Sequence, residues 1–334
     1  MQCSSSAANA FNLFCTVFSR KFMRVFSAAA DPHATPPPAA SSRTHPAEIN
    51  EENLKQHIYM LAGEIGERNI KRPEGLINAA HYISRQWQAM GYPIHTQGYY
   101  AHDIPCANLE ITQRGIGNPD RVIVVAAHYD TIGGCPGAND NGSGLAVMIE
   151  MARVVRALRL TSTVRFVALV NEEPPFFGTE HMGSWIYAHH ASKRGDDIQL
   201  AVILDTLGYY NHQPGSQLYP PLFGMAYPDK GDFVAFVSNL RSSRKASRFA
   251  SAFGQAKHLP YQKVIAPQII PGMNWNAQTP FSLHGYRAVM VTDTGPYRYP
   301  FYHSAKDTPE KLDYSHLALI TQGLVDAVAT LANE

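Results

Sequence analysis

The chain has 334 residues, of which 45% are hydrophobic and 16% charged, and its formal net charge is +1. This length suits one large domain or two modest ones, and the composition excludes general disorder. The near-neutral charge provides no electrostatic footprint for nucleic acid or for an anionic membrane surface. One basic run, Arg241, Arg244, Lys245 and Arg248, is predicted to be a solvated loop or helix face.

Residues 1–47 are predicted to be a disordered leader and linker that holds a candidate targeting segment. The first 30 residues contain no Asp or Glu, and the stretch 31–48 is rich in Pro, Ala and Ser. A targeting role and an uninformative leader both stay open. Residues 48–334 are expected to form a single domain, in which about 209–280 is an elaborated region over one edge of the sheet.

The cysteines and the hydropathy leave the compartment open. Four cysteines are present, and no CxxC pair is among them. A single Cys106–Cys135 disulfide stays open on this evidence. We expect no membrane span, because no stretch is both long and apolar enough to be a convincing one.

Hydrophobic periodicity predicts an α/β fold. Amphipathic helices fit roughly 48–65 and 76–90, and strands follow near 94–100 and 107–113. Nearly continuous apolar runs are typical of strands covered on both faces; the runs are Val122–Ala127, Val164–Val170, Leu200–Leu204 and Ala288–Thr292. Further helical patterns cover Ser143–Leu158, about Thr179–His190 and Tyr314–Ala332. We therefore expect three layers, with a mixed, mostly parallel central sheet and helices on both faces.

Polar side chains follow the apolar runs where each predicted strand ends. The first run leads to His128, the second to Glu172 and Glu173, the third to Asp205, and a loop after the fourth leads to His303. In open α/β sheets, sites form outside the carboxyl ends of the strands. Adjacent carboxylates at the edge of a core repel each other, and a divalent cation removes that cost. Nitrogen and oxygen donors together favour zinc.

A glycine-rich segment, 133–144, lies between the first predicted strand and the helix that follows. Its glycines allow a tight path from which Asp140 projects, with the helix beginning near Ser143. A phosphate-binding loop is disfavoured, because the Gly-Lys-Ser/Thr ending is missing. A glycine-rich turn with a helix cap is the structural alternative.

These segments together resemble the M28 family of zinc aminopeptidases. The matching pieces, in order over about residues 76–330, are Ala127-His128-Tyr129-Asp130, Gly137 to Gly144, Asn171-Glu172-Glu173, Leu204-Asp205, and Tyr302-His303-Ser304 with Asp307-Thr308. Each piece alone is a weak signal, whereas all five in order are specific. The resemblance implies an M28-like peptidase domain over 48–334, two Zn²⁺ ions per chain, and a peptide or small amide as substrate. It also favours a secreted or periplasmic location.

The resemblance further implies a role for each residue. Asp140 bridges two zinc ions, of which His128 and Asp205 complete one, while Glu173 and His303 complete the other. Asp130 orients the ring of His128, as is usual for a metal-bound imidazole. Glu172 is the general base for a di-zinc-bound hydroxide that hydrolyses N-terminal peptide bonds. Tyr302 is a candidate oxyanion or substrate contact, with a packing role as the alternative.

One departure from the family pattern concerns the substrate pocket. Many relatives carry an Asp-His pair where this chain has Ala277-Gln278, just before Thr279-Pro280-Phe281. After Glu173, the chain has Pro174-Pro175-Phe176-Phe177 where many relatives have glycine, which predicts a rigid, aromatic wall. The expected metal ligands are unaffected by either change.

Two other functions remain open on the sequence. A glutaminyl cyclase-like acyltransferase would have a similar fold. It would work with a single zinc, held by Asp140, Glu173 and His303. A non-catalytic binding module on the same scaffold is the second alternative, since a fold alone does not fix function. The presence of Glu172 beside five candidate ligands favours an enzyme, because a binding module has no use for a general base.

Overall fold

An eight-stranded sheet organises the described part of the protein. The computed structural model describes residues 48–220, 224, 226–255, 259–265 and 277–334, so the predicted leader and linker lie outside the described residues. The strand order is β1-β2-β4-β3-β5-β8-β6-β7. The strands are β1 (His95–Ala101), β2 (Ile104–Gln113), β3 (Asn118–His128), β4 (Ser162–Leu169), β5 (Asp197–Leu204), β6 (Val234–Ser238), β7 (Tyr261–Ile265) and β8 (Ala288–Thr292).

The sheet is mixed, as expected, but it is less parallel than expected. Strands β4, β3, β5 and β8 run parallel at its centre, and β6 pairs parallel with β7. Antiparallel pairs join β1 to β2, β2 to β4 and β6 to β8. Three of seven pairings are therefore antiparallel, so the sheet is evenly mixed rather than mostly parallel. The parallel centre brings the carboxyl ends of β3, β4 and β5 to one edge.

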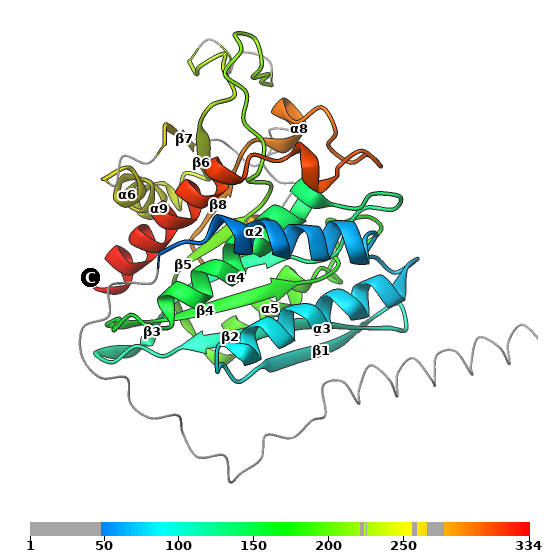
Figure 1. The fold of residues 1–334 in the computed structure, drawn as a ribbon. Helices are drawn as coiled ribbons and strands as arrows, with labels where there is room; N and C mark the ends of the chain where they lie inside the picture. The colour runs from blue at the N-terminus through cyan, green and yellow to red at the C-terminus, as the bar shows by residue number, and fades with distance from the viewer. Residues whose placement is uncertain (1–47, 221–223, 225, 256–258, 266–276) are drawn as a thin grey trace, which may run out of the picture.

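Helices cover both faces of the sheet, which confirms the three-layer architecture (Figure 1). One face carries α2 (Glu51–Ile58), η1 (Tyr59–Ile65), α3 (Pro73–Ala89), α4 (Gly144–Val155), α6 (Ser243–Gln255) and α9 (Tyr314–Ala332). The opposite face carries α5 (Gly183–Arg194) and α7 (Gln278–Leu283). Along β3, Ile123 and Val125 join the first core while Val122 and Val124 join the second. This alternation is what buries β3 on both sides.

Most predicted elements are present, and one begins later than predicted. Helix α5 starts at Gly183 rather than near Thr179, because residues 179–182 form a turn in which Met182 donates its backbone N–H to the Thr179 carbonyl. Within 209–280, β6 and β7 extend the sheet edge and α6 packs on α9, elements that weak periodicity did not predict.

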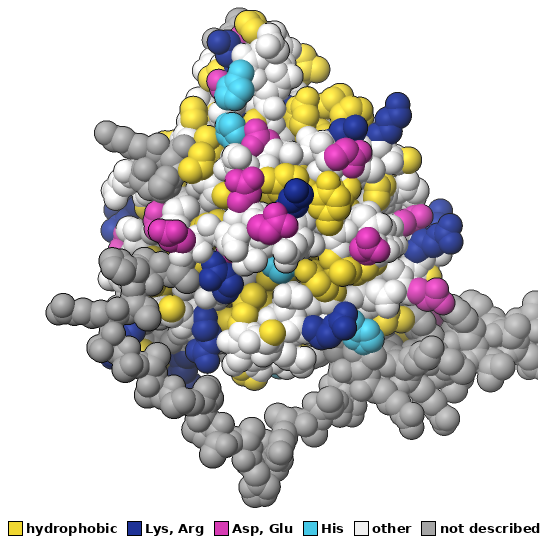
Figure 2. All heavy atoms as spheres, in the orientation of Figure 1, with side chains coloured by type: hydrophobic (Ala, Val, Ile, Leu, Met, Phe, Trp, Pro, Cys, Tyr) yellow, Lys and Arg dark blue, Asp and Glu magenta, His cyan; other side chains and the backbone are white. Residues whose placement is uncertain are grey.

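Two sequence expectations concern covalent and membrane constraints. Cys106 and Cys135 are both buried and free, so they do not form a disulfide with each other. Among the described helices, α9 is long and apolar enough to span a membrane, yet half of its apolar window is buried and it packs on α2, α4 and α6. Acidic and basic side chains are interspersed on the face in view (Figure 2).

Candidate metal centre

The end of the parallel strands gathers the predicted side chains. His128 is the last residue of β3, and Asp205 directly follows β5, which pairs with β3. Glu172 and Glu173 follow β4 on the other side of β3. His303 lies in the loop before η4 (Pro309–Lys311). Segments that are far apart in sequence therefore meet at one sheet edge, as parallel pairing requires.

Where the structure describes the chain, two groups of potential ligands share Asp140. His128, Asp140 and Asp205 form one group, and Asp140, Glu173 and His303 form the other; within each, the donor atoms all lie within 4.8 Å of one another. Nε2 of His128 is 3.3 Å from Asp140 Oδ1, and Nε2 of His303 is 2.9 Å from Asp140 Oδ2. Each carboxylate oxygen of Asp140 thus faces a different imidazole. This arrangement places one carboxylate between two candidate cation positions.

The backbone around Asp140 is held by residues outside the ligand set. The carboxylate of Asp307 accepts the backbone N–H groups of Asn139 at 2.8 Å and Asp140 at 3.1 Å. The fully buried guanidinium of Arg68 donates to the carbonyls of Pro136 and Gly137 at 2.7 and 3.0 Å. Together these contacts fix the segment from Pro136 through η2 (Ala138–Ser143), which contains Asp140.

Gly137 is required by that loop. Its φ is +68°, a left-handed conformation that favours glycine, and a Cβ there would collide with Thr131 Cγ2 and the Asp140 carbonyl. The glycine-rich sequence therefore serves the close approach of two backbone segments.

Asp130 lies beside His128. Nδ1 of His128 is 3.1 Å from the Asp130 carbonyl oxygen and 3.6 Å from its Oδ1. The other carboxylate oxygen accepts the backbone N–H of Glu173 at 3.0 Å. A hydrogen bond from Nδ1 leaves Nε2, the nitrogen that faces Asp140, free to coordinate a cation.

Glu172 belongs to neither ligand group and is anchored at the start of α5. Its carboxylate accepts two hydrogen bonds from Ser184, one from the backbone N–H and one from the hydroxyl, both 2.7 Å long. Burial raises the pKa of Glu172 to about 8, although both bonds favour the charged form. A carboxyl with a pKa near neutrality, held rigidly at the rim of the site, is suited to accept and return a proton.

The other carboxyls indicate that the site is built for a cation. Burial and the charge of Asp140 raise the pKa of Asp205 to about 7, and the same causes raise the pKa of Glu173. Burial would also raise the pKa of Asp140, but hydrogen bonds from both histidines outweigh it and the pKa is lowered. Buried acids that disfavour one another's charge become compatible when divalent cations bind among them. The two-His, three-carboxylate donor set fits zinc.

A cavity of about 160 Å³ opens beside these groups. Its wall includes apolar side chains next to the ligands, among them Pro174, Phe177, Ile203 and Ala277. The side chain of Gln278 donates to the carbonyls of Val237 in β6 and Ala288 in β8. Ala277 contributes a small apolar side chain to the cavity wall.

Tyr302 also lines the cavity and stacks on its neighbour. The rings of Tyr302 and His303 are 3.9 Å apart at 13°. The stack restrains the His303 ring, so a packing role is present. The place in the cavity wall also puts Tyr302 where a substrate can contact it.

Backbone strain concentrates at this edge of the sheet. His303 has φ +53°, and Asn171 and Thr206, which adjoin Glu172 and Asp205, have φ +64° and +50°. Residues with a side chain seldom adopt this region without a functional or structural constraint. Here it turns the chain sharply as each strand ends and aims the adjacent side chains inward.

Four further residues support the site but were not assigned these roles from sequence: Arg68, Ser184, Asp293 and Asp307. Asp293 directly follows β8 and accepts hydrogen bonds from Asn139 and the Tyr209 backbone at 2.9 Å each. The strand-end rule that found Asp205 would also have found Asp293. No comparable signal marks Arg68 or Ser184, because both act on backbone or side chains that are distant in sequence.

A three-layer α/β fold with His and carboxylate donors gathered where its parallel strands end is typical of metal-dependent hydrolases. Residues 110–328 match the sequence profile of Peptidase family M28. The chain is 30% identical over 289 residues to Uncharacterized protein YfbL of Escherichia coli, covering 84% of this chain and 88% of that protein. The chain therefore belongs to peptidase family M28 and is a zinc peptidase.

Shorter and structural similarities agree with this assignment. Aminopeptidase YwaD of Bacillus subtilis is 42% identical over 81 residues, which are 24% of this chain and 16% of that protein. BSAP, a zinc aminopeptidase from Bacillus subtilis, matches with a TM-score of 0.67 at 15% identity, covering 86% of this chain and 96% of that one. Fimbriiglobus ruber glutaminyl cyclase matches with a TM-score of 0.64 at 17% identity, covering 88% and 99%. At such identities these structures establish the fold alone.

Proposed function

We propose that the chain is an aminopeptidase with two zinc ions, bridged by Asp140. His128 and Asp205 hold one ion, and Glu173 and His303 hold the other. The observation that carries this proposal is the position of Asp140, whose two oxygens lie 3.3 and 2.9 Å from different imidazoles. When bound, the ions supply Lewis acidity and lower the pKa of a coordinated water toward ~7.

Residues of the chain supply the proton transfers and the positioning. Glu172 accepts a proton from the attacking water and returns it to the leaving amine, as general acid–base catalysis requires. Ser184 holds that carboxylate with two hydrogen bonds, and Asp130 orients His128. Tyr302 contacts the substrate carbonyl from the cavity wall. The apolar wall at Phe177, Ile203 and Ala277 receives the substrate's N-terminal residue.

The glutaminyl cyclase-like function has weaker support. A single-zinc site needs one ligand group, Asp140, Glu173 and His303, whereas here His128 and Asp205 complete a second group around the same bridging residue. A non-catalytic binding module leaves the rigidly held Glu172 without a purpose. The single-domain arrangement over 48–334, with its elaborated region at about 209–280, is part of the same proposal.

A substrate comparison tests the function. Purified, zinc-loaded protein is assayed on an aminoacyl-anilide, on the same anilide with its α-amine acetylated, and on a peptide with N-terminal glutamine. We expect hydrolysis of the first, at least about 100-fold less of the second because the free amine contributes to binding, and no cyclisation of the third. Cyclisation without anilide hydrolysis would contradict the proposal.

A further inference from the structure

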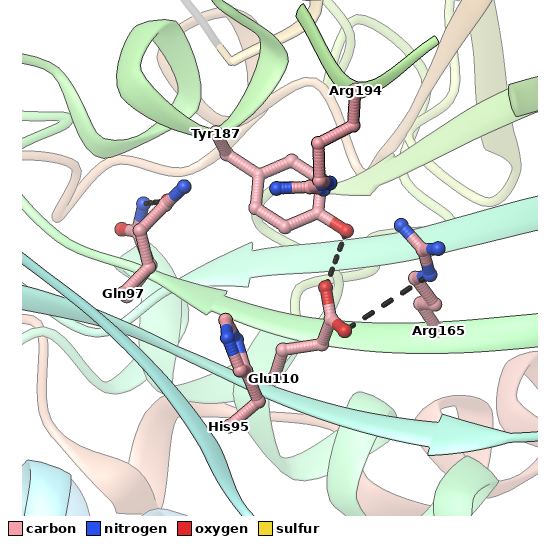
Figure 3. A pocket seen from close by; sticks show the side chains of 7 residues that line it. His95, Gln97, Glu110, Arg165, Tyr187 and Arg194 are labelled. Atoms are coloured by element: carbon pink, nitrogen blue, oxygen red, sulfur yellow. Dashed lines mark hydrogen bonds and ion pairs between the residues drawn. The ribbon is translucent and has the colours of Figure 1, made fainter. Parts of the chain in front are cut away.

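Two polar cavities lie away from the metal centre, and their charges are arranged differently. The first, about 170 Å³, lies between α5 and the β1-β2-β4 edge (Figure 3). In it the Tyr187 hydroxyl donates to Glu110 at 2.6 Å, and Arg165 pairs with Asp196 at 2.6 Å. The acidic and basic side chains here pair with nearby groups, so the cavity has no unpaired charge that would favour a charged ligand.

The second cavity, about 110 Å³, lies at the amino-terminal ends of β3, β4 and β5, under α6 and the end of α9. Arg121, Lys245 and Arg248 line it. Arg248 pairs with Glu334 at 2.8 Å, which neutralises the acid found in this wall among the described residues. The other two cationic side chains of the wall, Arg121 and Lys245, form no ion pair of this kind among the described residues.

Among the described residues, neither Arg121 nor Lys245 forms an ion pair with a carboxylate. The Lys245 ammonium donates to two neutral oxygens of Gln199, at 2.6 and 3.0 Å. In the described part of the chain, the guanidinium of Arg121 makes no hydrogen bond or ion pair. Burial, and then the charges of Arg287 and Arg121, lower the pKa of Lys245, and the more weakly acting carboxylates of Asp197 and Glu334 do not offset them. Like charges are therefore crowded around one hollow.

An independent observation comes from Ser162, which also lines the cavity. The residue is 2% exposed, and its hydroxyl has no hydrogen-bond partner among the described residues. A buried hydroxyl without a partner is costly, so most such groups bind a ligand or solvent. Ser162 is the first residue of β4, and its hydroxyl lies enclosed in the wall of this cavity.

We infer that this cavity binds a tetrahedral oxyanion, the phosphate group of a free ion or of a small ester. Arg121 and Lys245 supply the charge, and the Ser162 hydroxyl supplies a further donor. Guanidinium and ammonium groups are the usual partners of phosphate oxygens. The volume equals that of three to four waters at ~30 Å³ each, which suits an ion of five heavy atoms. The basic run noted in the sequence is thus mostly a solvated helix face, with Lys245 turned inward.

Thermal unfolding of the zinc-loaded protein tests this site. Inorganic phosphate or glycerol 3-phosphate is added against chloride at matched ionic strength. We expect phosphate at 100-fold its Kd to raise Tm by about 5 °C. Lys245→Met and Arg121→Met should each weaken that binding at least about 10-fold. Arg244→Met, an exposed change on the same helix and outside the cavity, should leave it unchanged.

Ser162→Ala separates the structural cost of the hydroxyl, measured without phosphate, from its contribution to binding, measured as the change in stabilisation by phosphate. Without phosphate its Tm should rise by about 2 °C, since an unpartnered buried hydroxyl is removed. The stabilisation by phosphate should shrink. A response to both ligands supports a site for the phosphate group, and a response to inorganic phosphate alone supports a site for the free ion. Equal phosphate shifts in wild type, Lys245→Met and Arg121→Met would overturn the inference and assign the ion to the metal centre.

Discussion

The two ends of the parallel strands carry opposite charge. At the carboxyl ends of β3 and β5, His128 and Asp205 adjoin a cluster of buried acids. At the amino ends of the same strands, Arg121 and Gln199 adjoin a cavity with unmatched cations. Strand β3 (Asn118–His128) joins these environments, since it contains both Arg121 and His128. Where buried side chains of one charge lack counter-charges, the site favours an ion of the opposite charge. The carboxyl ends therefore suit a cation, and the amino ends suit an anion.

The two ends also differ in how firmly they are built. Around the acids, hydrogen bonds from Ser184, Asp307 and Arg68 fix the side chains or backbone, and strained residues aim the ligands. Around the cations, Arg248 is exposed and Lys245 is half-buried. A rigid cluster is what catalysis needs, whereas a looser one suits reversible binding. Mutations should therefore have larger effects at the carboxyl end.

The largest effect is expected from Asp140→Asn. An amide cannot bridge two cations with two anionic oxygens, so both ions are lost or weakly held. We expect kcat/KM to fall by at least about 10³-fold, which corresponds to losing several kcal/mol of Lewis-acid stabilisation. Elemental analysis accompanies the assay. Asp313→Asn, which keeps a good N-cap on α9, is the matched control and should retain metal and activity.

Glu172→Gln should separate chemistry from metal binding. The glutamine still accepts a hydrogen bond from Ser184 but cannot take a proton from water. Metal content should stay at the wild-type value while kcat falls by about 10²–10⁴-fold. Unchanged hydrolysis in this variant would remove Glu172 from the mechanism.

A smaller effect is expected at Asp307. On the side that faces the metal centre, its carboxylate contacts backbone N–H groups and not a ligand side chain. Asp307→Asn replaces an acceptor of the Asn139 or Asp140 N–H with a donor, so the Asp140 loop loosens. Zinc affinity or activity should fall by about 10–100-fold. Tyr299→Phe removes one hydrogen bond of 2.8 Å to the same carboxylate and leaves both N–H contacts in place. It should change zinc affinity less than 10-fold, and an equal loss in both variants would show that the backbone contacts are not the cause.

The sequence predicted the elements whose signal is local. Continuous apolar runs located β3, β4, β5 and β8, and the polar residues after them proved to lie together at one edge. The short elements within 209–280 were missed. Strand β7 is the edge strand and is partly exposed, so it shows no apolar run, and the five-residue β6 stands in a stretch rich in Pro, Gly, Tyr and Phe. Periodicity over so few residues does not distinguish a strand from a loop.

Supporting residues escaped prediction for a different reason. Arg68 donates to carbonyls up to 69 positions away, and Ser184 reaches Glu172 across a turn whose path the sequence did not show. Such contacts depend on the path of the backbone in the folded structure, and residue type alone does not predict that path. The unmatched charge at the amino-terminal edge was likewise visible only after Lys245 and Arg121 were found beside one cavity.

Metal stoichiometry tests the central claim most directly. The purified protein is analysed for zinc by elemental analysis, then chelated, dialysed and titrated with zinc while aminoacyl-anilide hydrolysis is followed. The account predicts two zinc ions per chain, loss of hydrolysis on chelation, and recovery on refilling. One tightly bound zinc with full hydrolysis, or hydrolysis that survives complete removal of metal, would contradict it.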